Sequence, residues 1–138
     1  MKDFTKHNTN LFITNHAQTR MQQRCFSKAD IYAIVHCGTF INDKEILVTN
    51  KDAEREISIL CGRIKVLERR MDKDRIRRCG TDAHNVGGNL FSEISQLRQQ
   101  IQIIHRLKNR KIVICGNRVI TCYTCSKSEL KRISRRIN

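Results

Sequence analysis

Two runs of apolar residues in the middle of the chain recur at alternating steps of three and four. They are Ile57, Leu60, Ile64, Leu67 and Met71 in the first run, and Leu90, Ile94, Leu97, Ile101 and Ile104 in the second. This heptad spacing lines each run along one narrow face of a helix, and such a face needs a second helix to cover it. The link between the runs contains Gly80, Gly87 and Gly88. We therefore predict an antiparallel helical hairpin of coiled-coil type over residues 51–108.

The residues on both sides of the hairpin are patterned as short helices and strands. Helices are expected over 15–24, from Ser27 to Gly38 and from Ser126 onward, and strands over 39–41, 45–49, 111–115 and 118–124. On the last strand, alternation predicts Val119, Thr121 and Tyr123 on one face, with Ile120 and Cys122 on the other. The two ends of the chain, 1–50 and 109–138, are therefore predicted to form one α+β body into which the hairpin is inserted.

Charge and cysteine content narrow the classes of partner and compartment. The formal net charge is +14 over 138 residues, which favours nucleic acid, an anionic membrane or an acidic protein as partner. No apolar run is long enough to span a membrane, and the expected helices have faces suited to a protein core, so no membrane association is expected. Seven cysteines without an apolar leader sequence favour free thiols in the cytoplasm.

One polar row stands out on the first expected helix. His16, Arg20 and Arg24 recur every four residues and therefore share one helix face. A proton-exchanging imidazole beside two permanent cations is the composition of a phosphate-handling site. The alternative is an ordinary solvated face of a surface helix. A threonine hydroxyl and a phenol on the last strand, Thr121 and Tyr123, would complete a phosphodiester site that needs no metal.

A metal site is the weaker interpretation. Cys122 and Cys125 form a single Cys-x-x-Cys pair, whereas a structural zinc site needs a second pair at similar spacing. The other cysteines are scattered, and burial as small apolar residues accounts for them better. We expect no metal and no other cofactor.

These residues resemble a known family. The pattern His16-Ala-x-x-Arg20-Met-x-x-Arg24, followed by Ser27, Asp30-Ile31 and a helix ending at Gly38, is joined by a late strand reading Gly-Asn-Arg-Val-Ile-Thr-Cys-Tyr. Together they resemble a family of small bacterial domains of unassigned function that is grouped with the RelE-like toxins. That group lies within the ribonuclease fold shared by barnase, EndoU and the colicin nucleases. The resemblance covers residues 11–50 and 109–125.

The resemblance implies N-terminal helices packed on a small curved antiparallel sheet, and metal-independent cleavage of RNA, often by a toxin that an antitoxin holds inactive. It places the active-site positions on His16, Arg20, Arg24, Thr121 and Tyr123. Two features depart from the family pattern: the inserted hairpin, and Cys25-Phe26, which stands where a Gly-aliphatic pair is usual.

The chemical hypothesis is attack of an RNA 2′-hydroxyl on the adjacent phosphodiester. His16 would exchange the proton, while Arg20 and Arg24 would hold the phosphate. Tyr123 would donate a proton or stack against a base, and Thr121 would orient an oxygen. Further basic residues are predicted to bind nucleic acid around this site. They are Arg106, Lys108, Arg110, Lys111, Arg118, Lys131 and Arg132.

Two other functions stay open at this point. The same scaffold would serve a non-catalytic nucleic-acid-binding regulator, with residues 15–37 acting as a helix-turn-helix. Alternatively, the hairpin would belong to a protein-interaction adaptor and would recruit a second copy or another helix through its seams. The remaining alternative is that the two helices of the hairpin cover each other's seams with no partner. Its basic segment 69–78 is a further candidate for contact with a nucleic-acid backbone.

Overall fold

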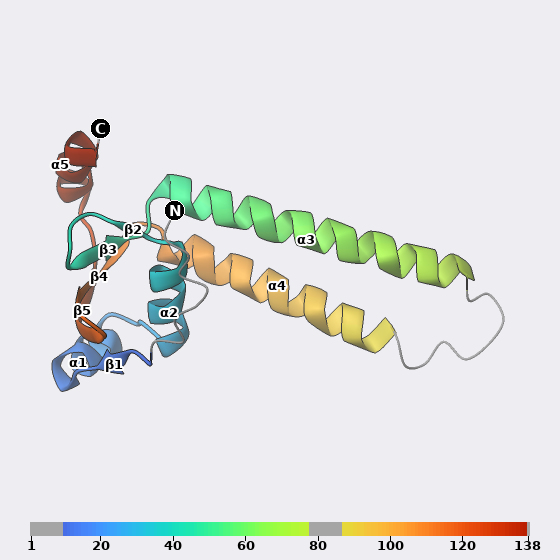
Figure 1. The fold of residues 1–138 in the computed structure, drawn as a ribbon, viewed down its shortest axis with the longest axis horizontal. Coiled ribbons are helices and arrows are strands. Elements are labelled where there is room, and N and C mark those ends of the chain that lie inside the picture. Colours follow the sequence, from blue (N-terminus) through green and yellow to red (C-terminus); the bar gives the residue numbers. More distant parts are fainter. Residues whose placement is uncertain (1–9, 78–86, 138) are drawn as a thin grey trace. The chain divides into compact units, whose positions relative to one another are not determined.

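Ten regular elements follow one another in the computed structural model, which describes residues 10–77 and 87–137 (Figure 1). In chain order they are β1 (Phe12–Ile13), α1 (Asn15–Gln23), α2 (Lys28–Cys37), β2 (Thr39–Phe40), β3 (Glu45–Leu47), α3 (Asn50–Arg77), α4 (Gly87–Leu107), β4 (Arg110–Cys115), β5 (Arg118–Thr124) and α5 (Lys127–Ile137). The predicted α+β class with an inserted helical hairpin is confirmed.

The chain divides into two compact units. Unit 1 comprises Met1–Ala53 and Leu107–Asn138, and unit 2 comprises Glu54–Arg106. The predicted boundaries, 50/51 and 108/109, lie close to these divisions. None of the helices in the described ranges is long and apolar enough to cross a membrane.

Unit 1 is built on a five-stranded sheet in the order β1-β5-β4-β3-β2. The pairs from β5 to β2 are antiparallel, as expected, whereas the short β1 runs parallel to β5 and was not predicted. Two residues are too few to show an alternating pattern in a sequence. Two hydrogen bonds position strand β1 instead. The Phe12 amide donates to the Asn117 carbonyl, and the Thr14 hydroxyl donates to the Val119 carbonyl at 3.0 Å.

Side chains cap the starts of the two N-terminal helices. The Thr14 hydroxyl accepts from the Ala17 amide, and Ser27 and Asp30 form a reciprocal capping box. Helix α1 contacts β5 and buries Ala17 and Met21, while α2 contacts β3 and β4. These contacts place both helices against the sheet, as predicted.

A β-bulge in β5 overturns the predicted alternation of that strand. Val119 pairs with Ile114, but Thr121 pairs with Val113, so Ile120 is an extra residue. One extra residue reverses every side chain on one side of the bulge relative to the other. Val119 consequently lies on the same face as Cys122, and both are fully buried. The prediction that Val119 shares a face with Thr121 and Tyr123 was wrong.

The two faces of the sheet carry different side chains. Ile46, Ile112 and Cys122 lie side by side in register and are fully buried. On the opposite face the next register row is Leu47, Lys111 and Tyr123. Helix α5 packs at this second face, where a small apolar cluster joins Leu47, Cys125, Ile133 and their neighbours.

Unit 2 is the predicted helical hairpin. The seam residues are buried on both helices: Leu60, Ile64 and Leu67 on α3, and Ile94, Leu97 and Ile104 on α4. An ion pair of 3.3 Å between Arg98 and Glu68 links the two helices at the surface. Part of the predicted glycine link, including Gly80, lies outside the described residues, as do Arg78 and the end of the basic segment 69–78.

The backbone at Cys25 has a conformation that suits the glycine of the pattern that the sequence resembles. Cys25 adopts φ 55°, in the left-handed region that glycine occupies without steric cost. The unusual turn is held by Arg110, whose guanidinium donates to the Cys25 carbonyl at 3.3 Å and lies 4.5 Å from the centre of the Phe26 ring. These contacts join the loop between α1 and α2 to β4.

We predict that Cys25→Gly raises the free energy of unfolding by about 0.5–1 kcal/mol. Glycine removes the steric cost of the left-handed conformation, and the greater conformational entropy of glycine in the unfolded chain offsets part of this stabilisation. Asn109, at φ 65°, is the matched control because asparagine tolerates this region. Urea unfolding followed by circular dichroism measures both variants. A gain in Cys25→Gly no larger than that in Asn109→Gly would contradict the prediction.

Candidate functional site

The C-terminal end of the predicted His/Arg row meets the last strand. The Arg24 guanidinium donates to the Cys122 carbonyl at 2.7 Å, and its central carbon lies 5.9 Å from the centre of the Tyr123 ring. Arg24 remains solvent-exposed and Tyr123 is half-buried. The structure thus joins two of the five predicted catalytic residues, which lie almost a hundred positions apart in the sequence.

His16 and Arg20, the other two residues of the row, make no such contact with β5. His16 is exposed, and its side chain makes no hydrogen bond or ion pair with any described residue. Arg20 is half-buried and donates to Gln23 at 3.1 Å. Eight residues separate His16 from Arg24, which corresponds to about 12 Å along a helix axis. A phosphate group bound at Arg24 therefore lies nearer to the C-terminal end of α1 than to His16.

Thr121 lies on the same face of β5 as Tyr123, two residues earlier and in register with Val113. It is half-buried. The bulge at Ile120 produces this placement, because an unbroken strand would have put both residues on the face of Val119. The two strand residues of the predicted site therefore remain together, but on the opposite face of the sheet from the buried Val119.

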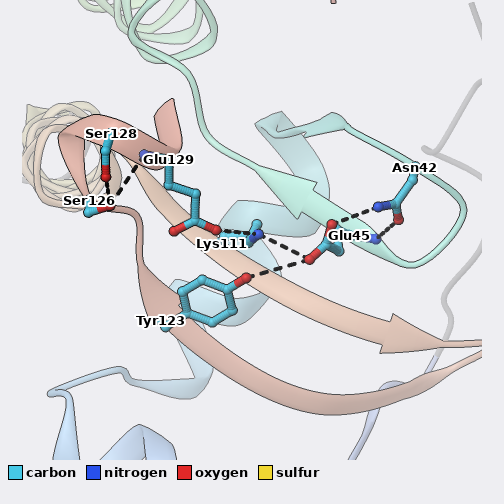
Figure 2. Close-up of polar contacts among 7 residues, drawn as sticks. All are labelled: Asn42, Glu45, Lys111, Tyr123, Ser126, Ser128 and Glu129. Carbon is cyan, nitrogen blue, oxygen red and sulfur yellow. Dashed lines mark hydrogen bonds and ion pairs between the residues drawn. The ribbon is translucent and has the colours of Figure 1, made fainter. Parts of the chain in front are cut away.

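Lys111 is the centre of a polar cluster that the sequence analysis did not anticipate (Figure 2). Its ammonium lies 3.0 Å from a carboxylate oxygen of Glu45 on β3 and 3.0 Å from one of Glu129 on α5. It also lies 4.6 Å from the centre of the Tyr123 ring. Lys111 was predicted to bind nucleic acid, but its side chain is buried between these groups and is not a surface cation.

The cluster extends to both sides of Lys111. Glu45 also accepts from the Asn42 amide at 2.6 Å and from the Tyr123 hydroxyl at 3.5 Å. On α5 the Ser126 hydroxyl accepts from the Glu129 amide, as a capping box predicts. The Glu129 carboxylate, however, turns to Lys111 (Figure 2). In the sequence, the position of Lys111 directly before the apolar residues of β4 could have indicated a buried lysine. Its partners could not be predicted, because they depend on tertiary structure.

The charges in this cluster support one another. Burial alone would raise the pKa of Glu45, but hydrogen bonds from Lys111 and Asn42 outweigh it and hold that pKa below its usual value. Burial alone would lower the pKa of Lys111, whereas the Tyr123 phenol and the two carboxylates raise it. Burial and the nearby carboxylates raise the pKa of Tyr123 despite the opposing effect of Lys111. At neutral pH the cluster therefore holds an ammonium, ionised Glu45 and a neutral phenol.

The Cys-x-x-Cys pair does not have the properties of a metal site. Cys122 and Cys125 are both buried, and burial raises the pKa of each thiol, to about 11 for Cys125. Zinc ligation requires thiolates, which these surroundings disfavour. Within residues 10–77 and 87–137 no group of three or more His, Cys, Asp or Glu side chains is arranged to hold a metal ion.

The remaining basic residues of the predicted interface are distributed over several elements. Arg118 is exposed and its guanidinium lies 5.8 Å from the centre of the exposed Phe12 ring. Arg110 is half-buried and holds the Cys25 turn, and Lys108 is also half-buried. Lys131 and Arg132 are exposed on α5, whereas Arg106 belongs to unit 2.

An open hollow of about 360 Å³ adjoins the polar cluster in unit 1. It is lined by Asn42, Asp43, Lys44, Glu45 and Val113. The predicted catalytic residues are not among its lining. This hollow is therefore separate from the predicted catalytic residues.

One known family resembles part of this chain. The model of a domain of unknown function (DUF4258) matches residues 13–65. The matched segment contains His16, Arg20 and Arg24, and it ends before β4 and β5. No curated protein and no solved structure matches the chain. The match carries no activity and no link to RelE-like toxins, so that resemblance stays a prediction.

We expect Lys111→Met to lower the free energy of unfolding by about 3 kcal/mol, because it leaves two partly buried carboxylates facing each other without their cation. Adding Glu45→Gln and Glu129→Gln to that variant is expected to recover part of the loss, since no unpaired charge then remains. Urea unfolding measures all three proteins. A triple variant less stable than Lys111→Met would show that the carboxylates do not depend on the ammonium.

Glu45 is expected to contribute a pH dependence of stability. Its pKa in the folded protein lies below the usual 4.5, so the unfolded chain binds this proton first as the pH falls. The contribution is complete above about pH 5 and is lost as the pH falls through the folded pKa. Glu45→Gln should therefore flatten the fall in unfolding free energy between about pH 5 and pH 3. Glu54→Gln, which removes an exposed carboxylate on α3, is the control, and equal slopes in the two variants would contradict this prediction.

Proposed function

We propose that unit 1 binds single-stranded RNA along α1 and the end of β5 and cleaves it without a metal ion. The observation that supports this most directly is the contact of the Arg24 guanidinium, on an exposed residue, with the Tyr123 ring. An arginine held at a fixed place beside an aromatic ring offers a phosphate contact and a stacking surface for a base together. A single-stranded nucleic acid uses both, and RNA also supplies the 2′-hydroxyl that the proposed cleavage needs.

The proposed reaction needs no group beyond the chain and the RNA. The 2′-oxygen attacks the adjacent phosphorus and loses its proton to a base, while the bond to the 5′-oxygen breaks and that oxygen gains a proton. The products are a 2′,3′-cyclic phosphate and a 5′-hydroxyl end. The residue proposed to exchange these protons is His16, since histidine is suited to this role near neutral pH.

The spacing along α1 assigns different nucleotides to different residues in this proposal. Arg24 and Tyr123 would hold one nucleotide, by its phosphate and its base. Arg20 lies about 6 Å from each end of the row along the helix axis and would hold the phosphate that is cleaved. His16, one further turn along, would face the reacting oxygens, and Thr121 would orient a ribose or phosphate oxygen.

Binding without cleavage is the second candidate, and specific contacts favour it. The Tyr123 hydroxyl is already directed at Glu45, and the Lys111 ammonium is bound by two carboxylates. The groups beside Arg24 would then recognise RNA without taking part in chemistry. This corresponds to a nucleic-acid-binding regulator on the same scaffold.

The proposal includes partners and a compartment. With a net charge of +14, the chain is suited to RNA and also to an acidic protein inhibitor, as expected for a toxin of a toxin-antitoxin pair. Both would be met in the cytoplasm. Several exposed cations on α5 are available to such partners: Lys127, Lys131, Arg132, Arg135 and Arg136.

Cleavage and binding of end-labelled single-stranded RNA, measured with a chelator present, test the proposal. We expect Arg24→Ala to weaken binding about tenfold, because one charge-assisted contact is lost. His16→Ala and Tyr123→Phe are expected to leave binding within about twofold, and His16→Ala to slow cleavage about a hundredfold or more. Lys65→Ala is the control, since it removes one exposed positive charge from unit 2.

Each outcome of this experiment separates the two candidates. Binding that Arg24→Ala weakens, with no cleavage by the unaltered protein, selects the non-catalytic regulator. Binding that changes no more in Arg24→Ala than in Lys65→Ala contradicts a site at α1 and β5. Circular dichroism of each variant verifies that it is folded.

A further inference from the structure

Helix α3 carries a second apolar surface, separate from its buried seam. Ile59 and Val66 are seven residues apart, so they lie on one side of the helix, and they are 48% and 49% exposed. Both belong to unit 2, as does the exposed Phe91 of α4. The seam residues of the same helix, such as Leu60 and Ile64, are buried. The exposed pair is therefore not needed for closing the hairpin.

A groove of about 500 Å³ runs along this surface within unit 2. Its lining consists of Ile59, Gly62, Arg63, Val66, Leu67 and Glu93. The first five residues come from α3 and the last from α4, so the groove has an apolar floor with one cation and one anion at its sides. We refer to it as the α3 groove.

Gly62 in this groove has no role within the chain itself. An added Cβ at this position would meet no atom within 4 Å, so the fold does not require glycine there. A glycine inside a helix costs about 1 kcal/mol relative to alanine. Its benefit is that another backbone can approach the helix closely at that position. This is an observation independent of the exposed apolar pair, and it points to a helix as the occupant.

The charges of the groove identify the occupant further. Arg63 and Glu93 are both exposed and have opposite signs. When two identical surfaces meet about a two-fold axis, residues away from the axis face different residues of the other copy, and each such contact occurs twice. Arg63 of each copy would then face Glu93 of the second copy, and the apolar residues would meet at the centre. Nucleic acid does not fit this surface, because it offers an apolar floor and a carboxylate.

We propose that the chain forms a two-fold symmetric homodimer in which the α3 grooves of two copies pack against each other as a four-helix bundle. The interface differs from the seam that the sequence suggested, since the seams are already covered within each hairpin. The dimer does not depend on the proposed RNA activity, and each can fail without the other.

Sedimentation equilibrium and light scattering of the full chain, treated with nuclease, test this proposal. The unaltered protein is expected to have twice the 16.2 kDa mass of one chain. Arg63→Glu leaves carboxylates facing each other in the dimer, and Glu93→Arg leaves guanidinium groups facing each other. Each variant is expected to raise the dimer dissociation constant at least about tenfold.

Mixing the two variants is the decisive step. In a heterodimer of Arg63→Glu with Glu93→Arg, both cross-copy contacts again join opposite charges. An equimolar mixture should therefore recover the dimeric mass, which a charge pair within one chain could not produce. Lys65→Glu is the matched control. Lys65 follows Arg63 by two residues, so its side chain lies on almost the opposite side of the helix. It makes the same charge change and should leave the dimer intact.

Gly62→Leu provides a second, independent measurement. The side chain has open space within one chain, so the helical circular dichroism signal should be unchanged or stronger, while the dimer dissociation constant should rise at least about tenfold. A monomeric unaltered protein, a mixture that stays monomeric, or a dimer that survives Gly62→Leu would each overturn the proposal.

Discussion

Lys111 projects from the middle of the sheet into surroundings where a lone ammonium would be unstable, and two carboxylates make its position possible. Glu45 comes from the neighbouring strand β3, and Glu129 comes from α5 near the end of the chain. Removing the ammonium would leave two partly buried carboxylates facing each other without a cation. The ammonium thereby couples β3, β4 and α5, and it lies against the Tyr123 ring. This interaction joins α5 to the sheet beside the apolar cluster of Leu47, Cys125 and Ile133, and it forms the surroundings of the candidate site.

A single extra residue determines which side chains share those surroundings. Ile120 interrupts the pairing of β4 and β5, so Val119 stays with the buried face while Thr121 and Tyr123 turn to the face of Lys111. Arg24 then reaches this region from the end of α1 and donates to the Cys122 carbonyl at the strand edge. The resulting surface combines a fixed guanidinium with an aromatic ring, which is the basis for proposing RNA as the ligand.

The two units differ in the kind of surface that they present. Unit 1 offers polar groups supplied by distant parts of the chain, whereas unit 2 offers an apolar groove with one cation and one anion. Polar groups in a fixed arrangement suit recognition of a charged ligand, and a self-complementary apolar groove suits a second copy of the chain. The inserted hairpin, unit 2, would then form the dimer, while the proposed RNA activity belongs to unit 1.

Most local elements were determined by the sequence alone, whereas the two-residue strand β1 was not. Heptad positions such as Leu60 and Ile94 define the hairpin, and caps such as Thr14 and Ser27 define the helix starts, because these signals act over one or two turns. The row of His16, Arg20 and Arg24 was likewise evident from its spacing. Only the tertiary structure decided which residue of this row contacts Tyr123, namely Arg24, and that Lys111 is buried between Glu45 and Glu129. Those outcomes depend on a bulge and on contacts between residues tens of positions apart, which local periodicity does not encode.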